Sequence, residues 1–289
     1  MKIQKAIIPV AGMGTRFLPA SKAQPKEMLA VVDKPVIQYI VEEAVASGIK
    51  EIIFVTAIGK RAIEDHFDRN FELEYRLEQK KKEKELKEIS AIGKLAKFAF
   101  VRQNKPLGDG HAILAALPFV NEDEPVAILF GDDIIDGRKP AIKQLIEVYS
   151  KYNDPVVAIQ QVPKKDVSSY GVIDGIQVSE QVWELNRFVE KPKVEDAPSN
   201  MIVVGRYVIT PEIMTLLKTQ KPGKGGEIRL ADAFATYLKK KKAMYACEFK
   251  GTRYDCGNKL GFLKAQVELG LKHPDTGRAL RRYLKKLVH

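Results

Sequence analysis

A short apolar run followed by a long basic loop is the feature that most constrains how this chain folds. The run at residues 6–10, AIIPV, has the length of a strand and no alternation of apolar and polar positions. A parallel strand covered on both faces has that pattern. A helix is predicted over residues 34–47, stopped by Gly48, and a second strand over residues 51–55. The opening therefore predicts the strand–helix–strand crossover of an α/β protein.

The loop after the first strand is suited to binding an anion. Gly12 and Gly14 let the backbone turn sharply and bring bare N–H groups close to a ligand. Arg16, Lys22 and Lys26 add cations along the same loop. The spacing fits neither a Walker P-loop nor the dinucleotide fingerprint, in which a third glycine would stand where this chain has phenylalanine. We predict a triphosphate site.

The formal net charge of +11 over 289 residues raises the hypothesis of a nucleic-acid-binding protein. Much of the excess lies in residues 80–82, 239–242 and 278–286. Aromatic residues are not interleaved with the lysine runs, as they would be on a base-stacking surface. We expect solvated helical faces and no nucleic acid partner.

Cys247 and Cys256 are the only cysteines, and together with four scattered histidines they make no zinc motif. No apolar run reaches the length that spans a bilayer. We therefore expect two reduced thiols in a cytoplasmic protein that does not enter a membrane.

Strand signals recur along the rest of the chain, and from residue 162 they dominate, with a hairpin signal at Asp174-Gly175. The predicted fold class is α/β, with a Rossmann-like, mixed but mainly parallel sheet flanked by helices and a small β-rich part. Residues 1–270 form one domain in this interpretation, with a charged helical insertion at about residues 71–92. Residues 271–289 are predicted to form a basic C-terminal helix.

Pairs of charged residues stand at two predicted strand ends. Asp132 and Asp133 follow a buried strand and Gly131. Carboxylates at that end of a strand hold Mg²⁺ in some proteins and only cap the next turn in others. Glu190 and Lys191 close the β-rich stretch before a proline, either as a binding pair or as an exposed pair on an edge strand.

The motif Gly12-x-Gly14-Thr15-Arg16, followed by PKEML at residues 25–29, resembles the opening of the sugar-phosphate nucleotidyltransferases. Residues 10–35 are most similar to the bacterial UTP–glucose-1-phosphate uridylyltransferases, also called UDP-glucose pyrophosphorylases. The likeness runs from about residue 7 to residue 270, and Ala30 departs from it where that family often carries proline. The resemblance implies the nucleotidyltransferase fold, a β-rich part that binds the sugar, and a homodimer or homotetramer.

The resemblance also implies a role for each motif residue, with Mg²⁺ as the cofactor. Catalysis would fall to Arg16, Lys26 and Lys191, nucleotide binding to Ala11, Gly12, Gly14, Thr15, Gln103 and Gly108, sugar binding to Asp133, Gly171, Glu190 and Gly205, and the metal to Asp132 and Asp255.

The reaction implied is reversible transfer of a uridylyl group from UTP to glucose 1-phosphate, which gives UDP-glucose and pyrophosphate. The second pKa of a phosphate monoester is about 6, so the attacking phosphate is anionic at neutral pH and needs no general base. Three alternatives stay open: the same chemistry with dTTP or CTP, a glycosyltransferase that releases UDP, and a basic nucleic-acid-binding module.

Overall fold

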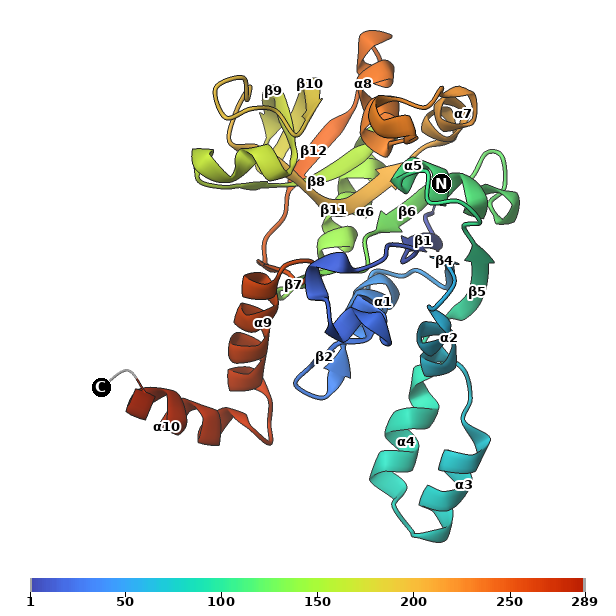
Figure 1. Ribbon diagram of the computed structural model, residues 1–289. Coiled ribbons are helices and arrows are strands. Elements are labelled where there is room, and N and C mark those ends of the chain that lie inside the picture. Colours follow the sequence, from blue (N-terminus) through green and yellow to red (C-terminus); the bar gives the residue numbers. More distant parts are fainter. Residues whose placement is uncertain (1, 288–289) are drawn as a thin grey trace.

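The computed structural model describes residues 2–287 and has a mixed α/β fold (Figure 1). The strands are β1 (Lys5–Pro9), β2 (Ala30–Val31), β3 (Lys34–Pro35), β4 (Glu51–Thr56), β5 (Lys97–Arg102), β6 (Val126–Leu129), β7 (Asp133–Asp136), β8 (Val156–Gln161), β9 (Gly171–Ser179), β10 (Val182–Glu190), β11 (Met201–Ile209), β12 (Tyr245–Glu248) and β13 (Thr252–Asp255). The α-helices are α1 (Val36–Ala46), α2 (Arg61–Phe67), α3 (Phe71–Gln79), α4 (Glu83–Ile92), α5 (Asp109–Ala116), α6 (Ala141–Tyr152), α7 (Pro211–Thr219), α8 (Leu230–Lys239), α9 (Lys259–Lys272) and α10 (Gly277–Leu287).

Nine strands form one sheet, in the order β5-β4-β1-β6-β11-β8-β12-β10-β9. Pairing is parallel among β5, β4, β1 and β6 and between β8 and β12, and it is antiparallel at the other joints. A further contact between β11 and β9 curls the far end of the sheet. The prediction of a mainly parallel sheet is therefore wrong for the second half of the chain. Only residues 180–181 connect β9 to β10, and a turn this short joins antiparallel strands, whereas a parallel pair requires a long crossover.

Helices cover both faces of this sheet. Side chains such as Ile8 and Phe54 pack toward α1, α2 and α6, whereas their neighbours Ile7 and Ile53 pack toward α5, α7 and α8. Both faces of β1 and β4 are consequently buried. That burial explains why these strands are apolar without alternation.

Two helical segments extend away from the sheet (Figure 1). The charged segment predicted at residues 71–92 is the helix pair α3 and α4, in which Asn70 caps α3 and Arg76 forms an ion pair with Glu72 at 2.6 Å. The predicted basic tail is α10, which begins at Gly277; Val288 and His289 lie outside the described residues. In the described part, 2–287, no helix combines the length and apolar character needed to cross a bilayer.

Candidate active site

Two adjacent cavities lie at the carboxyl ends of the central strands, where open α/β sheets bind ligands. The first, of about 320 Å³, is bounded by the loop after β1 and by the start of α5. The second, of about 180 Å³, is bounded by β9, β10, β11 and β13. Asp109, Phe130 and Asp132 line both cavities, so the two meet at the end of β6.

The first cavity contains most of the residues predicted to bind a nucleotide. Ala11, Gly12, Gln103 and Gly108 line it, as does Lys26. The amide nitrogen of Gln103 donates to the carbonyl of Gly108 at 3.0 Å and contacts a ring nitrogen of His111, also at 3.0 Å. Its amide oxygen is thus left to accept from a ligand. Gln103 is buried and is therefore not a surface glutamine.

Gly14 and Thr15 do not line either cavity. Gly14 has φ 67°, in the left-handed region, and its carbonyl accepts a hydrogen bond from Ser21 at 2.7 Å. A Cβ at Gly14 would lie 3.3 Å from side-chain atoms of Lys26. In this structure the glycine shapes the loop that carries Lys26, and nucleotide contact by Gly14 and Thr15 stays a prediction.

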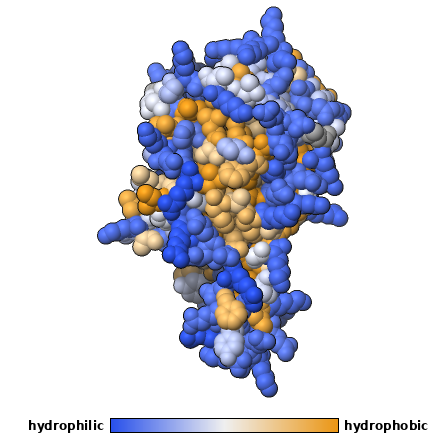
Figure 2. Space-filling view, turned by 90° about the vertical axis from the view of Figure 1, so that its right-hand side faces the viewer, coloured by the Kyte–Doolittle hydropathy of each residue, from blue (hydrophilic) through white to orange (hydrophobic). Residues whose placement is uncertain are grey.

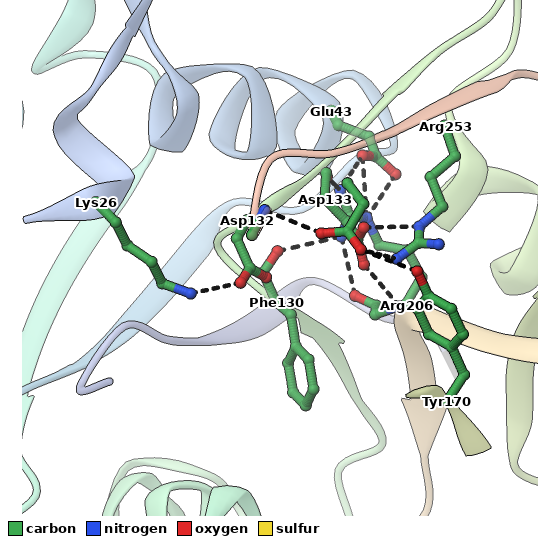
Figure 3. Close-up of polar contacts among 11 residues, drawn as sticks. Lys26, Glu43, Phe130, Asp132, Asp133, Tyr170, Arg206 and Arg253 are labelled. Atoms are coloured by element: carbon green, nitrogen blue, oxygen red, sulfur yellow. Dashed lines mark hydrogen bonds and ion pairs between the residues drawn. The ribbon is translucent and has the colours of Figure 1, made fainter. Parts of the chain in front are cut away.

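Lys26 and Asp132 form a close ion pair where the cavities meet (Figure 3). The Nζ of Lys26 lies 2.5 Å from Oδ2 of Asp132. Burial alone would raise the pKa of Asp132, but the cations of Lys26, Arg253 and Arg16 more than offset burial and hold it below its usual value. Burial likewise opposes the charge of Lys26, yet Asp132 and Glu27 raise the pKa of Lys26. Both groups are therefore charged at neutral pH.

Asp255 brings a second carboxylate to the same place. A Cβ built on Gly257 would lie 2.8 Å from Oδ2 of Asp132 and 3.0 Å from Oδ1 of Asp255, so the two carboxylates flank a space that only glycine leaves open. Oxygen ligands from one or two carboxylates, completed by phosphates and water, suit Mg²⁺. Within residues 2–287 there is no cluster of three or more acidic, histidine or cysteine ligands. The residues present fit a magnesium ion shared with a phosphate ligand.

The side chain of Asp133 is held by the protein itself. It is buried, and its oxygens accept from Nε of Arg253 at 2.7 Å and from the backbone N–H of Gly205 at 3.2 Å (Figure 3). Burial raises the pKa of Asp133 against the effect of Arg253. Antiparallel pairing of β7 with β13 places Asp133 opposite Asp255, which also accepts from the hydroxyl of Tyr170 at 3.0 Å. Arg253 thus neutralises two facing carboxylates.

The second cavity contains the residues predicted to bind the sugar. Gly171, Glu190, Gly205 and Asp133 line it. A Cβ on Gly171 would approach Phe188 to 2.8 Å and the carboxylate of Glu190 to 3.1 Å. Burial raises the pKa of Glu190, although Lys191 opposes the shift.

Arg16 and Lys191, both predicted to be catalytic, differ in their position relative to the cavities. Arg16 lines the second cavity, where its guanidinium donates to the carbonyl of Gly257 at 3.4 Å. Lys191 lines neither cavity; its Nζ is 3.7 Å from Glu190 and its side chain is 58 % exposed. Its backbone has φ 45° and donates to the carbonyl of Tyr170 at 3.0 Å. The structure therefore places the backbone of Lys191 beside the second cavity and its ammonium outside it.

The ion pair between Arg206 and Glu43 was not predicted from the sequence. Arg206 is fully buried on β11, and its guanidinium donates to both carboxylate oxygens of Glu43 on α1 (Figure 3). Arginine inside the apolar strand run at residues 201–209 and glutamate on the apolar face of a helix are the signals that could have revealed it.

Comparisons with known proteins agree with this arrangement. The nucleotidyl transferase family model matches residues 5–270. The UTP–glucose-1-phosphate uridylyltransferase YngB of Bacillus subtilis (strain 168) is 50% identical over 287 residues, which cover 99% of this chain and 96% of that protein. A UTP–glucose-1-phosphate uridylyltransferase of Staphylococcus epidermidis is 51% identical over 286 residues, 99% of each chain.

Solved structures are similar over most of the chain. A UTP-bound UDP-glucose pyrophosphorylase from Acinetobacter baumannii superposes with a TM-score of 0.90 at 43% identity and covers 99% of each chain. A UDP-glucose pyrophosphorylase in complex with UDP-glucose superposes with a TM-score of 0.85, also at 43% identity, and covers 94% of this chain and 100% of that one. The chain therefore belongs to the nucleotidyl transferase family and, within it, to the UTP–glucose-1-phosphate uridylyltransferases.

Proposed function

We propose that the protein transfers a uridylyl group reversibly from UTP to α-D-glucose 1-phosphate, giving UDP-glucose and pyrophosphate. The observation that carries this proposal is the junction of two cavities at Asp132, one lined by the predicted nucleotide residues and the other by the predicted sugar residues. Relatives that are 50% and 51% identical over nearly the whole chain carry the name of this activity.

In the proposed mechanism the protein aligns two anionic substrates and neutralises their charge. Gln103 and the backbone of Ala11, Gly12 and Gly108 would hold the base, and the β-rich wall around Glu190 would hold the hexose. A phosphate monoester is already anionic near neutral pH, with a second pKa of about 6, so in-line attack on the α-phosphorus needs no general base.

The charged residues would act on the phosphates. Lys26 and Arg16 would stabilise the departing pyrophosphate, and Lys191 would hold the attacking phosphate in line. Asp132 and Asp255 would hold Mg²⁺, which when bound supplies positive charge to the phosphate oxygens. Before substrate binds, the ammonium of Lys26 already neutralises Asp132.

A panel of nucleoside triphosphates tests the proposal. Pyrophosphate release should require glucose 1-phosphate and be fastest with UTP. The nearest competing function is the same transfer from dTTP, since one methyl group in a pocket changes specificity by only about 1–3 kcal/mol. Release of UDP from UDP-glucose, with no release of pyrophosphate from UTP, would instead indicate a glycosyltransferase.

The homodimer or homotetramer, the cytoplasmic location and the domain limits at residue 270 remain predictions. Light scattering of the purified protein would measure the oligomeric state directly.

A further inference from the structure

We propose that Arg206 is a positioning residue for the reaction, fixing the turn that carries Asp132 without touching a substrate. The turn spans residues 130–133 and joins β6 to β7. Arg206 lines neither cavity, and its side chain is fully buried. The inference rests on the proposed function, because it assigns Asp132 to the reacting phosphates.

The guanidinium of Arg206 binds the turn on both sides of Asp132. Nη1 donates to the carbonyl of Phe130 at 3.3 Å, and Nη2 donates to the carbonyl of Asp133 at 2.6 Å. Nη1 also donates to the carbonyl of Gly205 at 2.9 Å, so the turn is tied to β11. A planar group with five donors in fixed directions makes these contacts at once, whereas the compact ammonium of a lysine cannot.

Glu43 completes the arrangement from the opposite side. Its two oxygens accept from Arg206 at 2.7–3.1 Å, and Oε1 also accepts from the backbone N–H of Ile142 at the start of α6. Every nitrogen of the buried guanidinium therefore has a partner. The network links α1, α6, β11 and the turn, which makes it rigid enough to hold a carboxylate in place.

The backbone of the turn also packs closely against its surroundings. A Cβ on Gly131 would lie 2.8 Å from Val10 and 3.3 Å from Glu27, so the backbone packs closely against the first loop. Asp132 projects from this turn toward Lys26 and the space beside Gly257. A displacement of about 1 Å at a reacting centre costs about 100-fold in rate. Loss of the Arg206 contacts should therefore be seen mainly in kcat.

The double variant Arg206→Met, Glu43→Leu separates positioning from stability. Apolar residues of similar volume can replace a buried ion pair with little loss of stability, but here the carbonyl of Asp133 and the N–H of Ile142 also lose their partners. We expect a Tm lower by roughly 5–15 °C, KM values within about threefold, and kcat lower by about 100-fold. Hydrogen exchange of the backbone amides at residues 130–133, measured without metal or substrate, should become at least about tenfold faster.

Two further variants provide the contrast. Lys5→Met, Glu124→Leu removes an ion pair of 2.8 Å beside the opposite end of β1, and it should change neither kcat nor exchange at residues 130–133. Glu43→Gln leaves the carbonyl contacts of Arg206 but unbalances its charge. It should lower Tm by roughly 5–15 °C while kcat stays within about threefold.

A folded double variant with wild-type kcat and wild-type exchange would overturn the proposal, and so would a kcat that falls in proportion to Tm across the series. If the double variant does not fold, Arg206→Lys serves in its place, with the same expected loss of kcat and the same contradicting result. Absence of pyrophosphate release by the wild type would refute the proposed function, whereas exchange at residues 130–133 would still decide whether Arg206 fixes the turn.

Discussion

Side chains of opposite charge face one another beside the junction of the two cavities. Three carboxylates converge there, those of Asp132, Asp133 and Asp255, and the cations of Lys26 and Arg253 face them. Since Lys26 already binds Asp132, Asp132 would hold Mg²⁺ only by sharing or giving up that contact. The ammonium would then be released toward the phosphates of a nucleotide.

The variant Gly257→Ala tests whether the space between the carboxylates of Asp132 and Asp255 holds Mg²⁺. The backbone φ of Gly257 lies outside the left-handed region, so alanine is tolerated, but the added Cβ would stand between Asp132 and Asp255. We expect Gly257→Ala to keep its Tm within a few degrees and to need at least about tenfold more Mg²⁺ for half-maximal rate. Titration of activity with MgCl₂ measures this. An unchanged magnesium requirement would show that Mg²⁺ does not bind between Asp132 and Asp255 beside Gly257.

Lys191 is the predicted catalytic residue that the cavities do not include. We expect Lys191→Ala to lower kcat by at least about 100-fold at an unchanged Tm, because the ammonium would neutralise the attacking phosphate. Lys193→Ala, two residues along and also exposed, is the matched control and should stay within about twofold. Near-normal turnover in Lys191→Ala would show that the exposed ammonium of Lys191 does not contact the attacking phosphate.

At the scale of elements, the wall formed by β13 depends on the start of α9. The side chain of Asn258 caps this helix by accepting from the N–H of Gly261 at 2.8 Å. Asn258→Ala should cost about 1 kcal/mol and lower Tm by roughly 2–4 °C. Asn70→Ala removes the equivalent cap of the projecting helix α3, at 3.0 Å.

Thermal unfolding followed by circular dichroism compares the two caps. In Asn70→Ala, fraying of α3 should leave the main transition unchanged, because α3 has no buried residues. Equal Tm losses in both variants would mean that the α3–α4 pair unfolds together with the sheet.

Local patterns predicted the elements near the first loop, and they did not predict which distant strands pair. The apolar run at residues 6–10, the helix after it and the segment at residues 71–92 all carry short-range signals, and the structure has them, although α1 starts at Val36 because Lys34–Pro35 pairs with β2. The joining of β13 to β7 spans about 120 residues, and no periodicity encodes it. The same holds for Arg206 and Glu43, which are 163 residues apart.

In the site, too, residues in local motifs were predicted and contacts between distant strands were not. Ala11, Gly12, Gln103 and Gly108 could be grouped through the resemblance, and the structure places them together in one cavity. The buried role of Arg253 was not predicted, since no local pattern around this arginine distinguishes a buried cation from a solvated one. The register of β13 against β7 places Arg253 opposite Ile135, and from there its Nε reaches the carboxylate of Asp133 at 2.7 Å.

The whole molecule can be probed through its two thiols. Cys247 and Cys256 are buried, and burial raises the pKa of the Cys247 thiol to about 12, so at pH 8 it is neutral and unreactive. We expect no reaction with a thiol reagent such as Ellman's in the native protein and two equivalents after denaturation. Rapid labelling of native protein would contradict the packing of β12 and β13.

The pairing of β7 with β13 also bears on synthesis of the protein. Residues 253–255 form one wall of the cavity to which Asp132 contributes. A growing polypeptide lacks that wall until β13 has been synthesised, after all nine strands of the main sheet. The sheet can therefore assemble before the pocket closes, and premature termination upstream of β13 leaves a sheet without that wall of the site.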